Sequence, residues 1–124
     1  MDILISNSSD KPIYEQITSQ IKAMIMSGKL AAGEPLPSIR HMAKELRVSV
    51  ITTKRAYEDL ERDGFIETIP GKGSFVAAKN LSLIREEQLK AAEALLSEAV
   101  DIAKRSGITL DELTEMLRLL YEED

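Results

Sequence analysis

The chain has 124 residues, a formal net charge of −5 and 44% hydrophobic residues, enough for one compact domain or a small domain with an appendage. It has no cysteine, which excludes disulfides and thiolate metal sites and fits a reducing compartment. No apolar run approaches the ~18 residues of a membrane span, and the N-terminus lacks the basic-then-apolar order of a signal peptide. We therefore expect a cytoplasmic protein without membrane contact.

The acidic net charge is unevenly distributed along the chain. Residues 1–78 hold ten basic and ten acidic side chains, whereas residues 79–124 hold six basic and eleven acidic ones and carry the whole −5. Within the first part, the segment from Leu36 to Tyr57 has five basic residues against Glu45, a local charge of +4. A basic segment in an otherwise neutral region is typical of nucleic-acid binding, whereas the global charge alone argues against it.

The first helix is predicted after an extended, weakly ordered arm at residues 1–9. Pro12 suits the first helical position, because its missing N–H would be unpaired there. Gly28 is predicted to end the helix, since glycine accepts the left-handed conformation. The apolar residues between them recur at helical spacing and define one buried face: Ile13, Ile17, Ile21, Met24 and Ile25.

Two further helices are predicted after a Gly- and Pro-containing loop at residues 29–37. Ser38 caps a short second helix, and Ser49 caps a third helix over residues 50–63 that Gly64 stops. Only a tight turn at Arg47 and Val48 separates the two. Their predicted buried faces comprise Ile39, Met42, Ala43 and Leu46 in the second helix, and Thr53, Ala56, Tyr57 and Leu60 in the third.

A β-hairpin follows the third helix, because two β-prone runs at 65–69 and 74–77 flank a Gly-rich turn. Two helices joined by a short turn and followed by a hairpin are the parts of a winged helix-turn-helix. The predicted fold class is mainly α with a small β-hairpin. The predicted domains are the arm at 1–9, the winged helix at 10–78 and a two-helix region at 79–124.

The C-terminal region is predicted to dimerise. A long helix over 81–105 and a last helix, opened by a capping box from Thr109 to Glu112, carry more apolar positions than two helices bury by themselves. A second copy of the chain would complete a small bundle. The side chains predicted at the dimer interface are Leu89, Leu95, Leu96, Val100, Leu113, Met116, Leu117 and Leu120.

Several segments, in order and at matching spacing, resemble the GntR family of bacterial transcription regulators. They are the run from Gly28 to Arg40, the run from Val48 to Tyr57, and the hairpin segments Gly64–Ile66 and Gly71–Val76. The two-helix C-terminal region is similar to the YtrA-like subfamily. The resemblance implies a homodimer that binds double-stranded operator DNA and represses its own operon, often one with ABC transporter genes.

The resemblance also implies a DNA-binding role for individual positions. The third helix enters the major groove and the hairpin, or wing, approaches the minor groove. Many family members have an arginine that reads guanine where this chain has Val50. Valine is unable to make this bidentate contact but is able to pack on a thymine methyl group, so the usual operator of the family is not expected. An exposed isoleucine at position 51 likewise suits a base methyl group or a sugar. The predicted DNA-binding residues are Ser38, Arg40, Ser49, Val50, Ile51, Thr52, Lys54, Arg55, Gly71 and Lys72.

Simpler interpretations stay open for several of these residues. Lys54 and Arg55 are also compatible with a solvated helix face, and Arg40 with an ion pair to Glu34 or Glu45. The glycines at 71 and 73 are turn formers whether or not the turn meets DNA.

The sequence gives no positive sign of an enzyme. It shows no nucleophile–base constellation, no phosphate-binding loop and, with His41 as the only histidine, no metal site, and no cofactor is expected. An effector is not readable from it. The alternative function is a winged helix that binds proteins rather than DNA, which the +4 segment disfavours.

Overall fold

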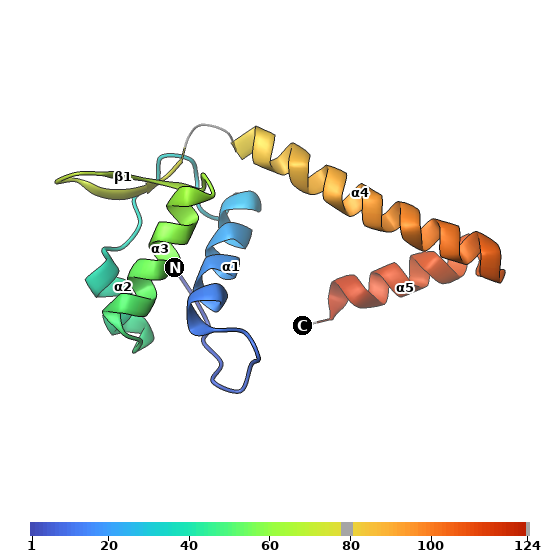
Figure 1. Cartoon of the computed structure of the whole chain (residues 1–124), viewed down its shortest axis with the longest axis horizontal. Coiled ribbons are helices and arrows are strands. Elements are labelled where there is room, and N and C mark those ends of the chain that lie inside the picture. The colour runs from blue at the N-terminus through green and yellow to red at the C-terminus, as the bar shows by residue number, and fades with distance from the viewer. Residues whose placement is uncertain (78–80, 124) are drawn as a thin grey trace. The chain divides into compact units, whose positions relative to one another are not determined.

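The structure, a computed structural model, describes residues 1–77 and 81–123 and divides into two units, Met1–Ile84 and Arg85–Asp124 (Figure 1). The predicted domain boundary between residues 78 and 79 lies outside the described residues. The elements confirm the predicted fold class. They are the helices α1 (Ile13–Met26), α2 (Ile39–Leu46), α3 (Val50–Arg62), α4 (Leu81–Ser106) and α5 (Leu110–Glu122), and the strands β1 (Ile66–Ile69) and β2 (Gly73–Val76).

Capping residues set the ends of α2 and α3 as the sequence predicts. The Ser38 hydroxyl accepts the backbone N–H of His41 at 3.1 Å, and the Ser49 hydroxyl accepts that of Thr52 at 3.0 Å. Between the two helices, Arg47 adopts the left-handed conformation with φ 58°. This residue lets the chain reverse within a few positions, and the backbone N–H of Val48 returns to the carbonyl of Ala43 at 3.0 Å.

The start of α1 and the arm before it differ from the prediction. Pro12 is the residue before the helix rather than its first member, and its carbonyl accepts the first hydrogen bonds of α1. The arm is not loose, because Ile3 is buried in the core. Gln20 brackets the backbone of Leu4 with two hydrogen bonds of 2.9 and 2.7 Å, and Gln16 does the same at Ser6 with bonds of 2.8 and 2.9 Å.

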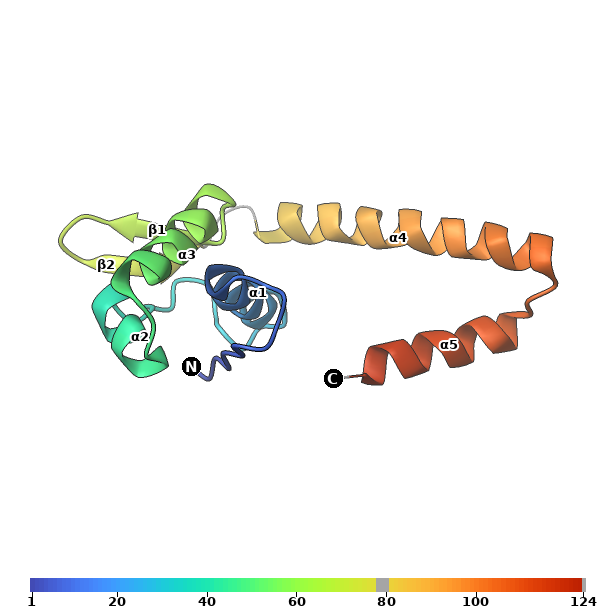
Figure 2. The ribbon, with the colours of Figure 1, turned by 60° about the horizontal axis from the view of Figure 1, so that its bottom comes forward.

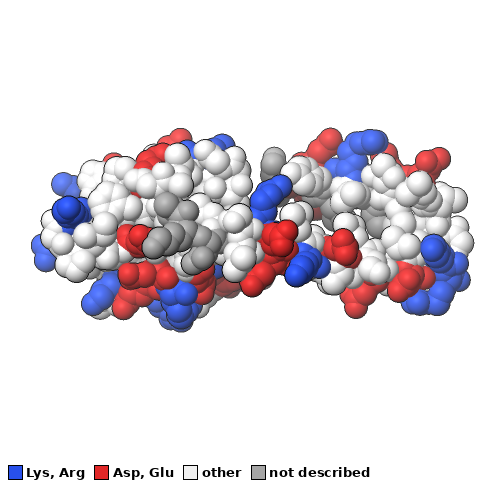
Figure 3. All heavy atoms as spheres, turned by 90° about the horizontal axis from the view of Figure 1, so that it is seen from above, with Lys and Arg blue, Asp and Glu red and all other residues white. Residues whose placement is uncertain are grey.

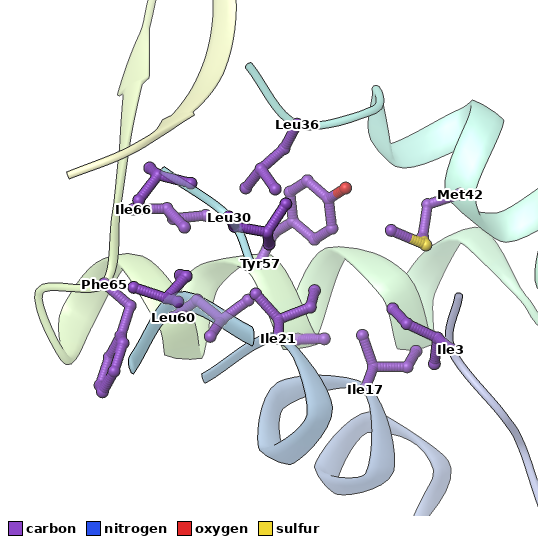
Figure 4. Packing of buried hydrophobic residues seen from close by; sticks show 13 residues of the cluster. Ile3, Ile17, Ile21, Leu30, Leu36, Met42, Tyr57, Leu60, Phe65 and Ile66 are labelled. Carbon is purple, nitrogen blue, oxygen red and sulfur yellow. The ribbon is translucent and has the colours of Figure 1, made fainter. Parts of the chain in front are cut away.

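One hydrophobic core joins the arm, α1, α3 and the hairpin (Figure 4). Ile17, Ile21 and Leu60 have no exposed surface, which is the condition under which apolar side chains contribute most to stability. Leu81 and Ile84, from the beginning of α4, pack against the same cluster. The remaining core members are Ile3, Ile25, Leu30, Leu36, Met42, Ala56, Tyr57, Phe65, Ile66 and Val76.

The hairpin is antiparallel, with Ile66 opposite Val76 and Ile69 opposite Gly73. The loop before α2 pairs with β2, because the Glu34 carbonyl accepts the Val76 N–H at 2.8 Å and Pro35 forms an isolated β-bridge with Phe75. β1 packs against α3, and Figure 2 shows the turn of the hairpin extending beyond that helix. The wing is therefore fixed to the helix-turn-helix on two sides, by α3 and by this loop.

The second unit exposes most of its apolar surface. Thr109 and Glu112 form the predicted capping box, and α5 folds back along α4 in both views (Figures 1 and 2). Among residues 85–123, Ala103 is the one apolar residue in the buried class. No helix within the described ranges is both long and apolar enough to cross a membrane.

Candidate nucleic-acid interface

The third helix presents one face to the core and the opposite face to solvent, as the sequence predicts. Thr53, Ala56, Tyr57 and Leu60 are buried, and the Thr53 hydroxyl donates to the carbonyl of Ser49 at 3.0 Å. On the outer side Ile51, Lys54 and Arg55 are exposed. The core thus fixes the rotation of α3 about its axis, and this rotation determines which side chains are available to a groove of DNA.

The hydroxyl groups at the starts of α2 and α3 are already engaged by the helices. Besides capping α3, Ser49 donates its own hydroxyl hydrogen to the hydroxyl oxygen of Thr52 at 2.8 Å. The hydrogen of Thr52 has no acceptor among the described residues and remains available to a phosphate. Of the hydroxyl residues predicted to bind DNA, Thr52 and Ser38 thus keep a free donor, whereas Ser49 acts through Thr52.

The basic residues around this face form no ion pair with the described part of the chain. Glu45 lies 3.1 Å from His41 and Glu34 accepts the Ala31 N–H at 3.1 Å, so neither of Arg40's two suggested partners contacts it. Arg55 makes a contact of another kind, since its guanidinium lies 3.7 Å from the ring centroid of Tyr14 on α1. A cation over an aromatic face is attracted by the ring, and this contact holds Arg55 in one place.

A buried tyrosine connects α3 to the entrance of α2. The Tyr57 hydroxyl donates to the carbonyl of Pro37 at 2.7 Å, directly before the capping residue Ser38. Burial raises the pKa of Tyr57 to about 12, because the phenolate would lose its hydration. This hydrogen bond sets the position of the α2 N-terminus relative to the outer face of α3.

The tip of the wing is exposed and basic. Gly71 and Gly73 have φ values of 78° and 108°, which side chains other than glycine rarely adopt, and the Lys72 N–H closes the turn on the Ile69 carbonyl at 2.9 Å. Lys72 projects from a backbone that is narrow enough to approach DNA closely. The left-hand edge of Figure 3, where the hairpin and α2 lie in Figure 1, shows lysine and arginine side chains.

Two contributions were not predicted from the sequence. Tyr14 anchors Arg55, and the Tyr57 hydroxyl orients the start of α2; both depend on contacts between residues far apart in the chain. Their only sequence signal is that each tyrosine occurs at a helical spacing typical of a core residue. Within residues 1–77 and 81–123, no group of three or more His, Asp or Glu residues is arranged to hold a metal ion.

Comparison with known proteins places this arrangement in one family. The family described as bacterial regulatory proteins, gntR family, matches residues 13–76. The chain is 32% identical over 116 residues to the HTH-type transcriptional repressor YtrA of Bacillus subtilis, covering 94% of this chain and 89% of that protein. A GntR family transcriptional regulator from Listeria monocytogenes has a similar structure, with a TM-score of 0.70 and 29% identity over 92% of this chain and 97% of that one.

A third relative was solved with DNA. The DNA-binding domain of AraR in complex with operator ORX1 aligns with 62% of this chain and 96% of its own, at 26% identity and a TM-score of 0.55. The matched region holds a helix-turn-helix, an exposed basic face on α3 and a wing, in the order that the sequence predicts. The chain therefore belongs to the GntR family and is a DNA-binding transcription regulator with a winged helix-turn-helix.

Proposed function

We propose that the protein is a homodimeric repressor that binds an operator in the promoter of its own operon, with α3 in the major groove and the wing at the minor groove. The observation that carries the DNA-binding surface is the set of exposed, unpaired cations on α2, α3 and the wing. Arg40, Lys54 and Lys72 are all exposed, and the described residues offer them no ion pair. Their free charge is what phosphates require, because each neutralised phosphate releases counterions.

Repression is supported by a relative, and an operator near the protein's own genes is part of the proposal through the resemblance to the YtrA-like subfamily. The B. subtilis relative that matches over 94% of this chain is named as a repressor. The AraR domain, which has a similar structure, was solved in complex with an operator, and this supports operator DNA as the partner of the winged helix. Genes for an ABC transporter in the same operon are part of the proposal through the resemblance to the YtrA-like subfamily.

The experiment is a gel shift of the full chain on the promoter of its own operon, repeated over a salt series. Arg40→Ala and Lys54→Ala should each weaken binding and flatten the salt dependence, since each removes about one phosphate or base contact. Lys90→Ala is the matched control, because it removes the same charge from α4, outside the proposed surface. Unchanged binding by both Arg40→Ala and Lys54→Ala would contradict the proposed surface.

The proposed dimer is supported by the apolar surface of the second unit. Leu95, Leu96 and Leu117 are 67%, 51% and 52% exposed, an arrangement that is unfavourable in water for a helix pair standing alone. A groove between α4 and α5 is lined almost entirely by apolar side chains. They are Leu96, Ala99, Val100, Leu110, Leu113, Met116, Leu117 and Leu120, with Thr114 beside them.

A second copy of the chain is the occupant that best fits this groove. Leu96, Val100, Leu113, Met116, Leu117 and Leu120 are predicted dimer residues that line it, and a mainly apolar lining is typical of the interfaces of homodimers. Two DNA-binding units related by twofold symmetry then read half-sites about 34–36 Å apart or a multiple of that.

The dimer is tested by sedimentation of Leu96→Glu, which places a charge in the groove. We expect a monomer that still contains the folded winged helix but binds its operator weakly. Leu83→Glu is the control, because Leu83 is 62% exposed and lies in the first unit at the beginning of α4. A Leu96→Glu protein that remains dimeric would show that the interface lies elsewhere.

A further inference from the structure

Two adjacent apolar side chains are exposed on the first turn of α3. Ile51 is 82% exposed and Val50 is 48% exposed. Residues 1–77 are all described, and the other large apolar side chains exposed there are Met1, Leu4 and Ile69. The start of α3 is therefore the place in the winged helix where exposed apolar side chains adjoin one another.

The first turn of α3 holds these side chains in fixed directions. Ser49 caps the helix at the Thr52 N–H, and Thr53, with no exposed surface, ties the turn to the core. Valine and isoleucine are β-branched and adopt essentially one χ1 rotamer in a helix. Little side-chain entropy is lost when such residues meet a ligand, so the pair is organised for contact before binding.

The polar surroundings of the pair suit DNA rather than an apolar protein face. Lys54 is exposed one turn further along α3, and Thr52 keeps a hydroxyl hydrogen for a phosphate. Glu45, the one acidic residue between Leu36 and Tyr57, is engaged by His41 at 3.1 Å. In the major groove of DNA, the apolar group on a base edge is the 5-methyl group of thymine.

We propose that Val50 and Ile51 determine operator specificity by packing on thymine 5-methyl groups in each half-site. This inference rests on the proposed function and names the base chemistry that its DNA surface reads. Neither side chain has a hydrogen-bond donor or acceptor, so the pair distinguishes thymine from other bases by shape and desolvation alone. The preferred half-site should contain thymines at the positions that face the start of α3.

The test uses a DNA duplex selected by the full-length protein from a random double-stranded library. Thymines of the selected site are then replaced one at a time by uracil, which keeps the hydrogen-bonding groups of thymine and lacks only the methyl group. At one or two positions per half-site, we expect the replacement to weaken binding about fourfold, the value of one buried methyl group.

Substitutions in the protein show which side chain contacts each thymine methyl group. In Ile51→Ala or Val50→Ala, the uracil penalty at the corresponding position should disappear, whereas Lys54→Ala should weaken the thymine and uracil duplexes by the same factor. Leu4→Ala is the matched apolar control, because Leu4 is 81% exposed on the arm and should leave the penalty unchanged.

Three results would overturn the inference, and they distinguish it from the proposed function. Tight binding that no uracil replacement weakens, or a penalty that survives in both Val50→Ala and Ile51→Ala, overturns the thymine contact and leaves the DNA-binding function intact. Failure to select any duplex overturns the proposed function and the inference with it.

Discussion

The two units of this chain differ in how much of their apolar surface they bury. In residues 1–84, thirteen buried apolar residues form one cluster that connects the arm, three helices and the hairpin. In residues 85–123, leucines on both helices are more than half exposed, including Leu95 and Leu120 at 67% and 63%. The first unit holds its DNA-binding surface in place through its own core, whereas the second unit leaves apolar surface exposed that the proposed second copy of the chain would cover.

The largest expected effect is a core truncation in the first unit. Leu60→Ala removes a side chain without exposed surface and should lower the free energy of unfolding by about 2–5 kcal/mol. Leu4→Ala, at a position that is 81% exposed, should cost almost nothing. Urea titration of both variants measures the difference, and equal stability would contradict a self-contained core.

The contribution of the buried Tyr57 to the stability of the first unit is tested at alkaline pH. Its folded-state pKa of about 12 lies above the ordinary value near 10, so the unfolded chain loses its proton first. The stabilisation is therefore complete below pH 10 and is lost as pH rises from 10 through 12, a change of up to about 2–3 kcal/mol.

Melting of two variants between pH 8 and 12 measures this loss. Tyr57→Phe should be less stable at neutral pH, because the bond to the Pro37 carbonyl is missing, but its stability should fall less between pH 10 and 12. Tyr121→Phe, at a side chain that is 88% exposed, should behave like the unmodified protein. If Tyr57→Phe lost as much stability between pH 10 and 12 as the unmodified protein, the loss would come from the titration of another group.

A smaller effect on stability is expected in the second unit, where α5 depends on its own helix cap rather than on a buried core. Thr109→Ala removes the capping box and should destabilise α5 by about 1 kcal/mol. Thr114→Ala makes the same substitution inside α5 and should favour the helix by a few tenths of a kcal/mol. Both substitutions are made in Leu96→Glu, which lacks the proposed partner, and helix content is measured by circular dichroism. We expect helix content to fall in Thr109→Ala and to rise slightly in Thr114→Ala. Equal changes in helix content would contradict a cap-dependent α5.

The smallest expected effect concerns the ion pair that joins α1 to the end of α3. Lys22 lies 2.9 Å from Asp63, and this hydrogen bond lowers the pKa of Asp63. The resulting stabilisation is present above the ordinary carboxyl pKa and is lost as pH falls through the lowered one. Because both side chains are more than a third exposed, Asp63→Asn should cost below ~1 kcal/mol in urea titrations at neutral pH; a larger cost would show that the pair contributes to the core.

Local signals in the sequence were sufficient for most element ends. Ser38, Ser49 and Thr109 each cap a helix as predicted, because a capping bond depends on residues three positions apart. The outer face of α3 was predictable for a similar reason, since helical periodicity separates Ile51 and Lys54 from the buried side.

Contacts across the fold were not predictable in this way. The arm was expected to be weakly ordered, yet Ile3 is buried and Gln16 and Gln20 hold its backbone. The run from Ile3 to Ile5 is apolar throughout, so the sequence does not separate the buried Ile3 from Leu4, which is 81% exposed. Nothing in the order of residues indicates that Arg55 stacks on Tyr14, since the contact depends on how α1 and α3 pack.

In the turn between α2 and α3, the backbone conformation of residue 47 favours glycine, whereas binding to DNA favours a cation at the same position. A side chain in this conformation costs roughly 1 kcal/mol relative to glycine, and Arg47 bears that cost at φ 58°. A glycine there would relax the turn but remove one of the five cations of the basic segment. Arg47 is thus a position where a gain in stability would come with a weaker attraction to DNA, and selection for thermal tolerance and selection for operator affinity would favour different residues.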